Sequence, residues 1–515
     1  MTPGDRPRGG TTLAWETLLP LGDGPGPLRD RLERSIRDAV HAGIVPPGSA
    51  LPPSRLLAET LGVSRWVVTE AYGQLVAEGF LEAVVGSGTR VPLHATPRPA
   101  AVAGAPATVG TIDAPAADRA GSAPPLRGEY RRPRFDLGPG VPDLRHVPRA
   151  RWVDAMRRAL DHAPDSELVV LDPLGHPLAR TAVAGYLARS RRAVVSPDDV
   201  VLTHGATDGM RAVVAGLRAA GHRSLLVEDP SWDRLRDLAA SAGLTPVPVP
   251  VDGEGIDVDR LVEASARTGT RAALVTPAHQ FPVGTALSSA RRDAIVRWAR
   301  AVDGVVIEDD YDAEFRYDRR PIAALQGLAP DRVVLLGSLS KSVAPALGIG
   351  WSVMPASLRH RMPLPELARP SVLDQLALRQ FIVSGDLERH LRAARGRFRR
   401  RRAALLDALA RDLPDLAVSG IAAGMHAALE LPDGVSGRAV RRAAADLEVG
   451  VSDLARYRVS APARGGGRDS LILGYGNLSD ALVDAAVARL AAAIRSVEQG
   501  TRPDAPAGHR GGAPD

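Results

Sequence analysis

The sequence predicts a multidomain protein in which a small helical domain precedes a large α/β domain. The chain has 515 residues, which is more than one ordinary hydrophobic core accommodates. Helix and turn signals are dense over residues 27–91, whereas apolar strand-like runs alternate with helical runs from 134 to 498. The stretch between them is rich in Ala, Pro and Gly, so we expect two compact units joined by a linker.

Changes in composition set the expected boundaries. Stretches rich in Gly and Pro lack periodic apolar residues, apart from a short apolar patch at 13–21, and cannot bury enough surface to offset the entropy lost on ordering. The expected order is a flexible N-terminal tail (1–26), a small helical domain (27–91), a flexible linker (92–133), a large α/β domain (134–498) and a disordered tail (499–515).

Composition excludes several kinds of protein. The absence of cysteine excludes disulfides, cysteine nucleophiles and thiolate metal sites, and it is compatible with a reducing compartment such as the cytoplasm. The 12 histidines show no metal-ligand spacing, so no metal site is expected. No apolar run reaches the roughly 18 residues of a membrane span, and no signal peptide follows Met1, so no membrane association is expected.

Three helices and a hairpin are expected in the small domain. Apolar residues recur at helical spacing over 28–43, a second helix over 54–61 ends at a glycine, and Ser64 can cap a third helix. The run 80–91 fits two short strands around a Gly-Ser-Gly turn. Two helices joined by a tight turn and followed by a hairpin are typical of a winged helix-turn-helix, with an ordinary small helical domain as the alternative.

The stretch LPPSRLLAETLGVSRWVVTEAYGQLVAEGFLEAVVGSGTRV closely resembles the DNA-binding domain of the GntR transcriptional regulators. The resemblance implies that double-stranded operator DNA is a partner. The residues that it places on the DNA are Arg55, Ser64 and Arg65 at the starts of two helices and Gly86 and Gly88 in the wing. Arginine can fork onto guanine or phosphate, and a helix N-terminus favours phosphate.

Bulk charge does not carry the expectation of DNA binding. Residues 27–91 contain seven arginines against seven acidic residues, although the whole chain has a net charge of +6. The densest basic run, at 392–413, has leucines at helical spacing, and we interpret it as a solvated helix face. Trp66 and Val67 depart from the family pattern, which often has a small polar residue followed by threonine.

The run SLSKSVAP holds the one lysine of the chain, Lys341, and every other residue of the Lys+Arg total is arginine. A desolvated lysine can lose its proton and attack a carbonyl carbon to form a Schiff base, whereas a guanidinium stays charged and cannot. Chance survival of a single lysine at a surface position is the alternative. The surroundings of Lys341 therefore decide between the two.

Several candidate residues follow the ends of predicted strands, where ligands collect in open α/β sheets. Lys341 follows VVLLGS, Asp309 ends VVIED, and Trp232 comes shortly after SLLVED. The run 205–207 begins a helix after VVLTH, which can bind an anion. A lysine, a carboxylate for the pyridine nitrogen, a phosphate cup and a stacked aromatic ring are what pyridoxal phosphate requires.

Residues 134–498 look like a fold-type I aminotransferase, and the fused chain resembles the MocR subfamily of GntR regulators. The resemblance implies a pyridoxal 5'-phosphate-dependent transferase fold in which Lys341 is the catalytic, cofactor-bound lysine. It places Asp309 on the pyridine nitrogen and Tyr311 on the ring hydroxyl. The other cofactor residues that it implies are Trp232 against the ring, Ala206, Thr207, Ser338 and Ser340 on the phosphate, and Gln280 near the asparagine of aminotransferases.

The chain departs from the aminotransferase pattern at two places. Gly348 stands seven residues after the lysine, where the family usually has a phosphate-binding arginine. The run SLILGYGN holds no arginine to clamp a substrate carboxylate, and Arg234 is the expected substitute in a ligand site. Weaker candidates for the clamp are Arg456, Arg458 and Arg468.

The leading interpretation is a bacterial transcription regulator that binds pyridoxal phosphate, senses an amine or amino acid, and acts as a homodimer. An active aminotransferase with an accessory DNA-binding domain is the alternative, and a DNA-binding protein with an empty fold is a third. Because the clamp and one phosphate anchor are missing, an incoming amine is expected to replace Lys341 while transamination is slow or absent.

Overall fold

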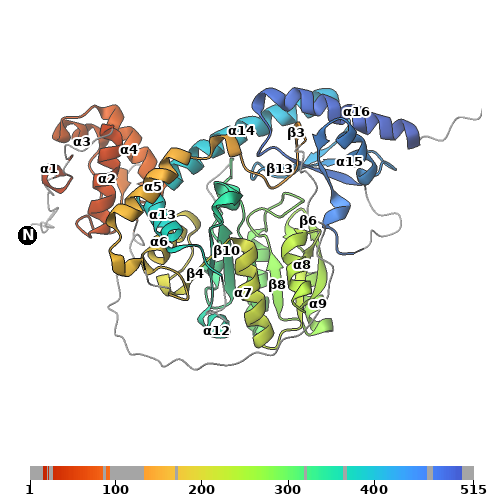
Figure 1. The fold of residues 1–515 in the computed structure, drawn as a ribbon, viewed down its shortest axis with the longest axis horizontal. Helices are drawn as coiled ribbons and strands as arrows, with labels where there is room; N and C mark the ends of the chain where they lie inside the picture. The colour runs from red at the N-terminus through yellow and green to blue at the C-terminus, as the bar shows by residue number, and fades with distance from the viewer. Residues whose placement is uncertain are drawn as a thin grey trace, which may run out of the picture.

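The computed structural model describes residues 15–19, 21, 27–84, 88–92, 133–168, 172–317, 322–362, 368–460 and 468–501. The chain forms an N-terminal helical domain, an α/β domain around an eight-stranded sheet, and a C-terminal subdomain around a four-stranded sheet (Figure 1). The linker expected over 92–133 lies almost entirely outside the described residues.

The N-terminal domain has the predicted helices and hairpin. Gly62 ends the second helix of the pair in a left-handed conformation, and the Ser64 hydroxyl accepts a hydrogen bond from the Val67 amide at the start of the next helix. The apolar faces of the helices meet in one buried core that includes Leu32, Leu57 and Leu75. The elements are α1 (Trp15–Leu18), α2 (Leu28–His41), α3 (Ser54–Leu61), α4 (Arg65–Ala77), β1 (Glu82–Val84) and β2 (Gly88–Arg90).

The expectation of a flexible tail over 1–26 needs correcting at its described residues. Trp15–Leu18 form the short helix α1, and Leu19 is fully buried in the core of the N-terminal domain. Burial of Leu19, which belongs to the apolar patch noted in the sequence, therefore offsets the conformational entropy lost when this segment is ordered. At the other end, α16 (Val483–Thr501) continues into the first residues of the expected C-terminal tail.

The α/β domain is built on a sheet with the strand order β4-β11-β10-β9-β8-β5-β6-β7. Strands β10, β9, β8, β5 and β6 pair in parallel, whereas β11 is antiparallel to both of its neighbours and β7 is antiparallel to β6. Leu336 pairs with Asp309 in the centre of the sheet. The strands are β4 (Val200–Thr203), β5 (Ser224–Asp229), β6 (Thr245–Asp252), β7 (Gly255–Ile256), β8 (Ala272–Val275), β9 (Val305–Asp309), β10 (Val333–Ser338) and β11 (Gly350–Val353).

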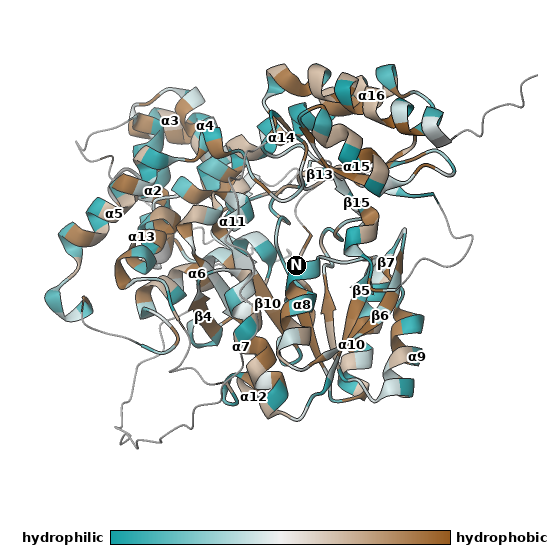
Figure 2. Ribbon diagram, turned by 45° about the vertical axis from the view of Figure 1, so that its right-hand side comes forward, coloured by the Kyte–Doolittle hydropathy of each residue, from teal (hydrophilic) through white to brown (hydrophobic). Residues whose placement is uncertain are grey.

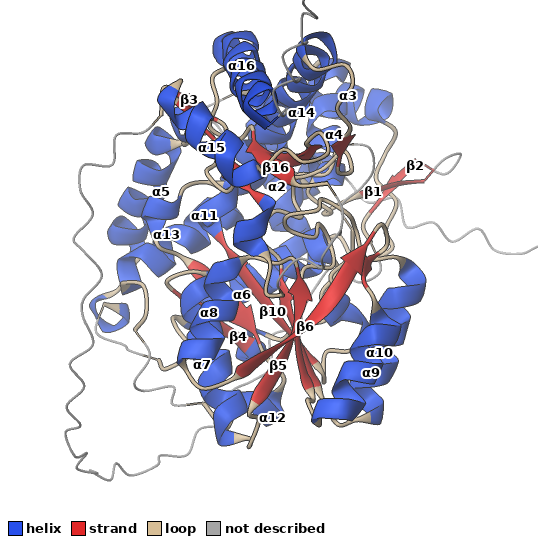
Figure 3. Cartoon of the chain, turned by 90° about the vertical axis from the view of Figure 1, so that its right-hand side faces the viewer, coloured by secondary structure: helices blue, strands red, loops and turns tan. Residues whose placement is uncertain are grey.

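Both faces of this sheet are buried, as its continuous apolar strands require (Figures 2 and 3). Neighbouring residues of β5 point to opposite sides: Leu225 packs with helices α7 and α8, and Leu226 with α9 and α10. The helices of this domain are α5 (Arg149–His162), α6 (Pro177–Arg191), α7 (Ala206–Ala219), α8 (Asp233–Ser241), α9 (Val258–Thr268), α10 (Ser289–Ala301), α11 (Leu339–Ser342), α12 (Ala356–Arg359) and α13 (Val372–Val383).

The C-terminal subdomain carries a sheet of order β12-β13-β16-β15, and β14 pairs in parallel with β3 from the start of the α/β domain. Its elements, with β3, are β3 (Phe135–Asp136), α14 (Asp386–Asp412), β12 (Val418–Ser419), β13 (His426–Glu430), α15 (Gly437–Asp446), β14 (Val449–Gly450), β15 (Ser452–Asp453), β16 (Ser470–Gly474) and α16. Among the helices described, none is long and apolar enough to cross a lipid bilayer.

The long helix α14 contacts three parts of the molecule. Near its N-terminus, the His390 ring donates a hydrogen bond from Nε2 to the Ser342 carbonyl oxygen at 2.9 Å, directly after Lys341. At its middle, the buried Arg401 donates to the Tyr475 carbonyl oxygen at 3.0 Å and to the Asp143 carboxylate at 2.9 Å. The helix therefore connects the lysine-bearing turn with the C-terminal subdomain (Figure 1).

The N-terminal domain meets the α/β domain at a set of buried charges. Arg37 of α2 pairs with Glu78 at 2.7 Å and with Glu33 at 3.3 Å. Arg389 of α14 reaches Glu33 from the other domain at 3.3 Å. We call this set the interdomain ion cluster, and its members are Glu33, Arg37, Glu78, Arg189, Glu388 and Arg389.

Candidate functional site

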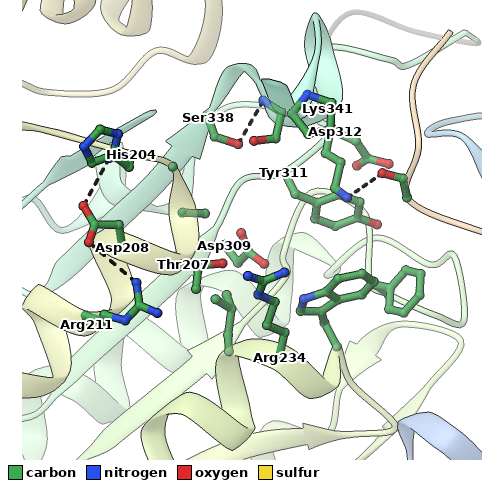
Figure 4. A pocket seen from close by; sticks show the side chains of 18 of the residues that line it. His204, Thr207, Asp208, Arg211, Arg234, Asp309, Tyr311, Asp312, Ser338 and Lys341 are labelled. Atoms are coloured by element: carbon green, nitrogen blue, oxygen red, sulfur yellow. Dashed lines mark hydrogen bonds and ion pairs between the residues drawn. The ribbon is translucent and has the colours of Figure 1, made fainter. Parts of the chain in front are cut away.

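A cavity of about 470 Å³ opens at the carboxyl ends of the parallel strands (Figure 4). Loops after β4, β5, β8, β9 and β10 converge there, as expected for an open α/β sheet. The structure brings nearly all of the candidate cofactor and ligand residues to its wall, namely Ala206, Thr207, Trp232, Arg234, Asp309, Tyr311, Ser338, Ser340 and Lys341.

Lys341 lies on the single turn α11, directly after β10. Its Nζ donates a hydrogen bond to the Gly140 carbonyl oxygen at 2.5 Å and lies 5.2 Å from the centroid of the Trp232 ring. Burial lowers the pKa of this amine, although the nearby Asp309 carboxylate opposes the shift. Gly140 has φ of 92°, a conformation that favours glycine, and a Cβ there would lie 3.0 Å from Nζ.

Asp309 ends β9 and faces the same space. Its side chain is buried, and its Oδ1 atom has no hydrogen-bond partner within the described structure. Burial, assisted by the charge of Asp310, raises the pKa of Asp309 to about 7, and Lys341 partly opposes this. A buried carboxylate oxygen without a partner is costly, which indicates that a ligand donor completes it.

Tyr311 is held by a short chain of polar groups behind the cavity. Its hydroxyl donates to the His279 carbonyl oxygen at 2.9 Å, and His279 Nδ1 lies 2.9 Å from Asp312 Oδ2. All three side chains come from loops at strand ends, and burial raises the pKa of Tyr311 well above its usual value. The phenol is therefore fixed in a neutral state beside Asp309.

Trp232 stands at the start of α8 and packs against two aromatic rings. Its ring is edge-on to Phe281, with centroids 5.1 Å apart, and lies nearly parallel to Tyr457 at 6.5 Å. Phe281 lines the cavity, whereas its neighbour Gln280 does not. The Gln280 amide instead donates to the buried Glu228 at 3.1 Å, so the structure does not bring Gln280 together with the other candidates.

The start of α7 and the end of β10 form a cup of small residues. Gly205 precedes α7 with φ of 124°, and its backbone would lie 2.5 Å from a Cβ added to Gly350. These two glycines let the helix start approach strand β11 closely. Amide groups at the helix start and the hydroxyls of Ser338 and Ser340 can then bind an anion between them.

The arginines expected to replace the missing clamp lie in different places. Arg234 lines the cavity and is exposed. Arg456 pairs with Asp233 at 3.0 Å and Arg468 pairs with Asp433 at 3.1 Å, and neither lines the cavity, nor does Arg458. Strand β16, which corresponds to the strand that carries the clamp in aminotransferases, is buried and contains no basic residue.

Gly205 of the expected anion site also lines the cavity, whereas other residues of its wall were not predicted from the sequence to bind a ligand. They are Gly140, His204, Asp208, Arg211, Leu235, Phe281, Asp312, Pro345, Ala368, Met425 and His426. Gly140 reaches the cavity from the segment before the first helix of the α/β domain, and His426 from β13. Sequence spacing holds no signal for such long-range contacts. Asp312 is the exception, because it lies only three residues after Asp309 at the end of the same strand.

Three buried side chains near Tyr311 also form a potential metal-ligand set. Within the part of the chain that the structure describes, His279, Asp312 and His426 place ligand atoms within 4.8 Å of one another. The expectation of no metal site depended on spacing along the sequence, which cannot detect a group assembled by the fold. In the structure, His279 Nδ1 is occupied by its contact with Asp312.

The proposed DNA-binding residues lie on the outer face of α3 and α4. Arg55 and Arg65 border the same shallow hollow around Gly62, and both are exposed. Arg55 lies 3.4 Å from Glu59 in an exposed ion pair, which contributes little stability and can yield to phosphate. Ser64 is the N-cap of α4, Gly88 begins β2, and Gly86 lies outside the described residues.

Comparison with known proteins supports the assignment of both domains. Residues 133–461 match the family "Aminotransferase class I and II", and residues 28–91 match "Bacterial regulatory proteins, gntR family". The chain is 31% identical over 483 residues to the probable rhizopine catabolism regulatory protein MocR of Rhizobium meliloti, covering 92% of this chain and 95% of that protein. This chain belongs to the MocR-type regulators of the GntR family.

A second MocR-type relative is the pyridoxine biosynthesis transcriptional regulator PdxR of Corynebacterium glutamicum. It is 34% identical over 418 residues, which cover 79% of this chain and 83% of that protein. The two relatives are named for different processes, although both are transcription regulators. The family thus establishes a DNA-binding transcription regulator, as the sequence predicted.

Solved structures confirm the predicted fold of the large domain. An archaeal alanine:glyoxylate aminotransferase superimposes with a TM-score of 0.63 at 23% identity, covering 70% of this chain and 91% of that protein. LysN, an α-aminoadipate aminotransferase from Thermus thermophilus, superimposes with a TM-score of 0.63 at 24% identity, and the match covers 71% of this chain and 93% of LysN. The MocR-type regulator therefore has a fold-type I aminotransferase domain, whose cofactor is pyridoxal 5'-phosphate.

The residues of the cavity fit this cofactor. The unpartnered Oδ1 of Asp309 suits a protonated pyridine nitrogen, and the amine of Lys341 has a lowered pKa. The cup at the start of α7 suits the phosphate. When bound, pyridoxal phosphate forms a Schiff base with an amine and draws electrons from the bonds beside it.

Proposed function

We propose that this regulator holds pyridoxal phosphate through Lys341, senses an amine or amino acid in the same cavity, and acts as a homodimer in the cytoplasm. The position of the one lysine of the chain carries the proposal. Its Nζ donates to a carbonyl oxygen of the cavity wall and, among the described residues, forms no ion pair. A charge buried for stability is usually paired with an opposite charge, so this amine is better suited to chemistry.

The other residues have separate tasks in this proposal. Asp309 keeps the pyridine nitrogen protonated, and the Tyr311 phenol oxygen, whose own proton goes to the His279 carbonyl oxygen, accepts a hydrogen bond from the ring hydroxyl. Trp232 limits the tilt of the ring, since Phe281 and Tyr457 pack against the indole. The phosphate group is bound by Ala206, Thr207, Ser338 and Ser340.

In this proposal, the N-terminal domain binds the operator DNA. Arg55 and Arg65 present exposed guanidinium groups at the starts of α3 and α4, and the Ser64 cap shapes the helix start between them. We propose that these residues, together with Gly86 and Gly88, contact operator DNA. An effector changes DNA binding only if it binds one arrangement of the two domains better than another.

The test of the cofactor role is spectroscopic. Purified protein is expected to show the absorption band of lysine-bound pyridoxal phosphate, and Lys341→Arg is expected to lose the band while keeping its circular dichroism. Borohydride reduction followed by peptide mapping should place the cofactor on Lys341. Arg55→Ala is the matched control, because it alters the other domain and should keep the band. Cofactor attached at no lysine, or a band that persists in Lys341→Arg, would contradict the proposal.

A further inference from the structure

The phosphate end of the cavity raises a problem of charge. A phosphate monoester carries about −1.5 to −2 charges near pH 7. Aminotransferases usually place an arginine seven residues after the lysine, and this chain has Gly348 there. Gly348 has φ of 56° and ψ of 39°, a left-handed conformation that glycine adopts without strain. Position 348 therefore contributes no cation.

The imidazole of His204 lies next to the space that a side chain at 348 would enter. A Cβ added to Gly348 would have His204 Nδ1 as its nearest neighbour, at 3.8 Å. Nδ1 itself lies 3.2 Å from the Gly348 carbonyl oxygen. His204 directly precedes Gly205, the N-cap of α7, and lines the cavity beside Asp208 (Figure 4).

The other basic side chains of the cavity have other positions or partners in the structure. The basic residues among its described lining are His204, Arg211, Arg234, Lys341 and His426. Lys341 serves the attachment end, and His426 lies with His279 and Asp312 in the buried set near Tyr311. Arg234 belongs to α8, at the start of which Trp232 stands. Arg211 lies 3.8 Å from Asp208, whose charge it offsets.

We propose that His204 supplies the phosphate-binding cation that position 348 lacks. The Gly348 carbonyl can accept only from a protonated Nδ1, so Nε2 donates to a phosphate when the ring carries both protons. The His204 amide donates to Asp208 Oδ2 at 3.1 Å, which fixes the backbone from which the imidazole extends. This inference depends on the proposed use of the cavity.

The experiment compares two probes that differ only in the phosphate group. Apoprotein is titrated with pyridoxal phosphate and, separately, with pyridoxal, and binding is followed by absorbance. His204→Ala is expected to weaken binding of pyridoxal phosphate by about 10-fold or more, the scale of one charge-assisted hydrogen bond. Binding of pyridoxal is expected to stay unchanged. His204→Arg, which restores a cation, should keep most of the affinity for pyridoxal phosphate.

His162→Ala is the matched control, because this histidine is exposed on α5 and does not line the cavity. Unchanged affinity for pyridoxal phosphate in His204→Ala would overturn the inference. An equal loss for both probes would also overturn it, since His204 would then act through the shape of the cavity. The same holds if His204→Arg binds pyridoxal phosphate as weakly as His204→Ala. If the unsubstituted protein bound neither probe, the proposed function would fail as well.

Discussion

Asp309 is the residue at which burial and function conflict most directly. The folded protein buries this carboxylate with one oxygen unpartnered, and burial raises its pKa from about 3.8 to about 7. A carboxyl group with a raised folded pKa binds more protons in the folded state than in the unfolded state between these two values. Its contribution to the stability of the apoprotein therefore falls as the pH rises from about 4 to about 7.

Asp309→Asn should remove this pH dependence, because the amide has no charge to bury. We expect the apparent unfolding temperature of the variant apoprotein to exceed that of the unsubstituted apoprotein by more at pH 8 than at pH 5. The difference in free energy of unfolding has an upper bound of about 4 kcal/mol, at 1.36 kcal/mol per pKa unit. Asp259→Asn, on the exposed surface of α9, is the control. A difference that is the same at both pH values would contradict the prediction.

Arg55 and Arg65 are expected to account for a measurable share of operator binding. Arg55→Ala and Arg65→Ala should each weaken binding to the promoter region of a neighbouring gene by roughly 1–3 kcal/mol, the cost of one lost bidentate contact. Affinity should be measured at fixed salt, with Arg260→Ala as a control that removes an equal charge from the exposed surface of α9. Operator affinity that is unchanged in both variants would show that the outer face of α3 and α4 is not the DNA-binding surface.

At the scale of elements, strand β16 explains why turnover is expected to be poor. Its five residues are buried and none of them is basic, so it offers no cation to hold a substrate carboxylate. Orientation of the substrate supplies much of the rate in such reactions, and its loss is costly. A sensor needs only binding, and Arg234 at the start of α8 is free among the described residues to bind a carboxylate.

Arg234→Ala should therefore separate amino acids from simple amines. The variant is expected to bind an amino acid effector about 10-fold more weakly, and its decarboxylated amine with unchanged affinity. Spectral titration of the cofactor-loaded protein measures both. Mixtures with a keto acid acceptor should give little product, and sustained multiple turnovers would favour the aminotransferase alternative. A loss of equal size for both ligands would remove Arg234 from the effector site.

The central elements were predictable because the middle of the sheet is buried on both faces, so β4, β5, β8, β9 and β10 are largely apolar runs with a polar residue at or directly after their ends. Lys341 and Asp309 could be found in this way, since Lys341 lies three residues after such a run and Asp309 ends one. Gln280 and Phe281 show the limit of the method. They are adjacent in a loop, and only packing determines that the ring faces the cavity and the amide faces Glu228.

At the scale of the whole molecule, the interdomain ion cluster joins the DNA-binding domain to the cofactor domain. Glu33 is fully buried and has partners in both domains, Arg37 and Arg389. Breaking a buried ion pair leaves an uncompensated charge, which typically costs about 3–5 kcal/mol. The sequence did not predict this contact, because helical periodicity marks a buried face but not the domain that covers it.

Arg389→Ala is expected to weaken the contact between the domains. Amide exchange in α2 and α4 should become faster, and the apparent unfolding temperature should fall. Arg399→Ala, an exposed position on the same helix, is the control and should change neither. Exchange in α2 and α4 that matches the unsubstituted protein would show that other contacts hold the domains together.

The contacts of α14 have a consequence for any tilt of this helix around its buried residue Arg401. His390 lies eleven residues nearer the N-terminus, roughly 16 Å along the axis, and Arg389 beside it contacts the DNA-binding domain. A tilt of about 5° around Arg401 would move the end of the helix that carries His390 by about 1.4 Å. The hydrogen bond from His390 to the Ser342 carbonyl is 2.9 Å long and cannot stretch by that amount. If α14 tilts together with the DNA-binding domain, the lysine-bearing turn must therefore move as well, or the hydrogen bond between His390 and the Ser342 carbonyl must break.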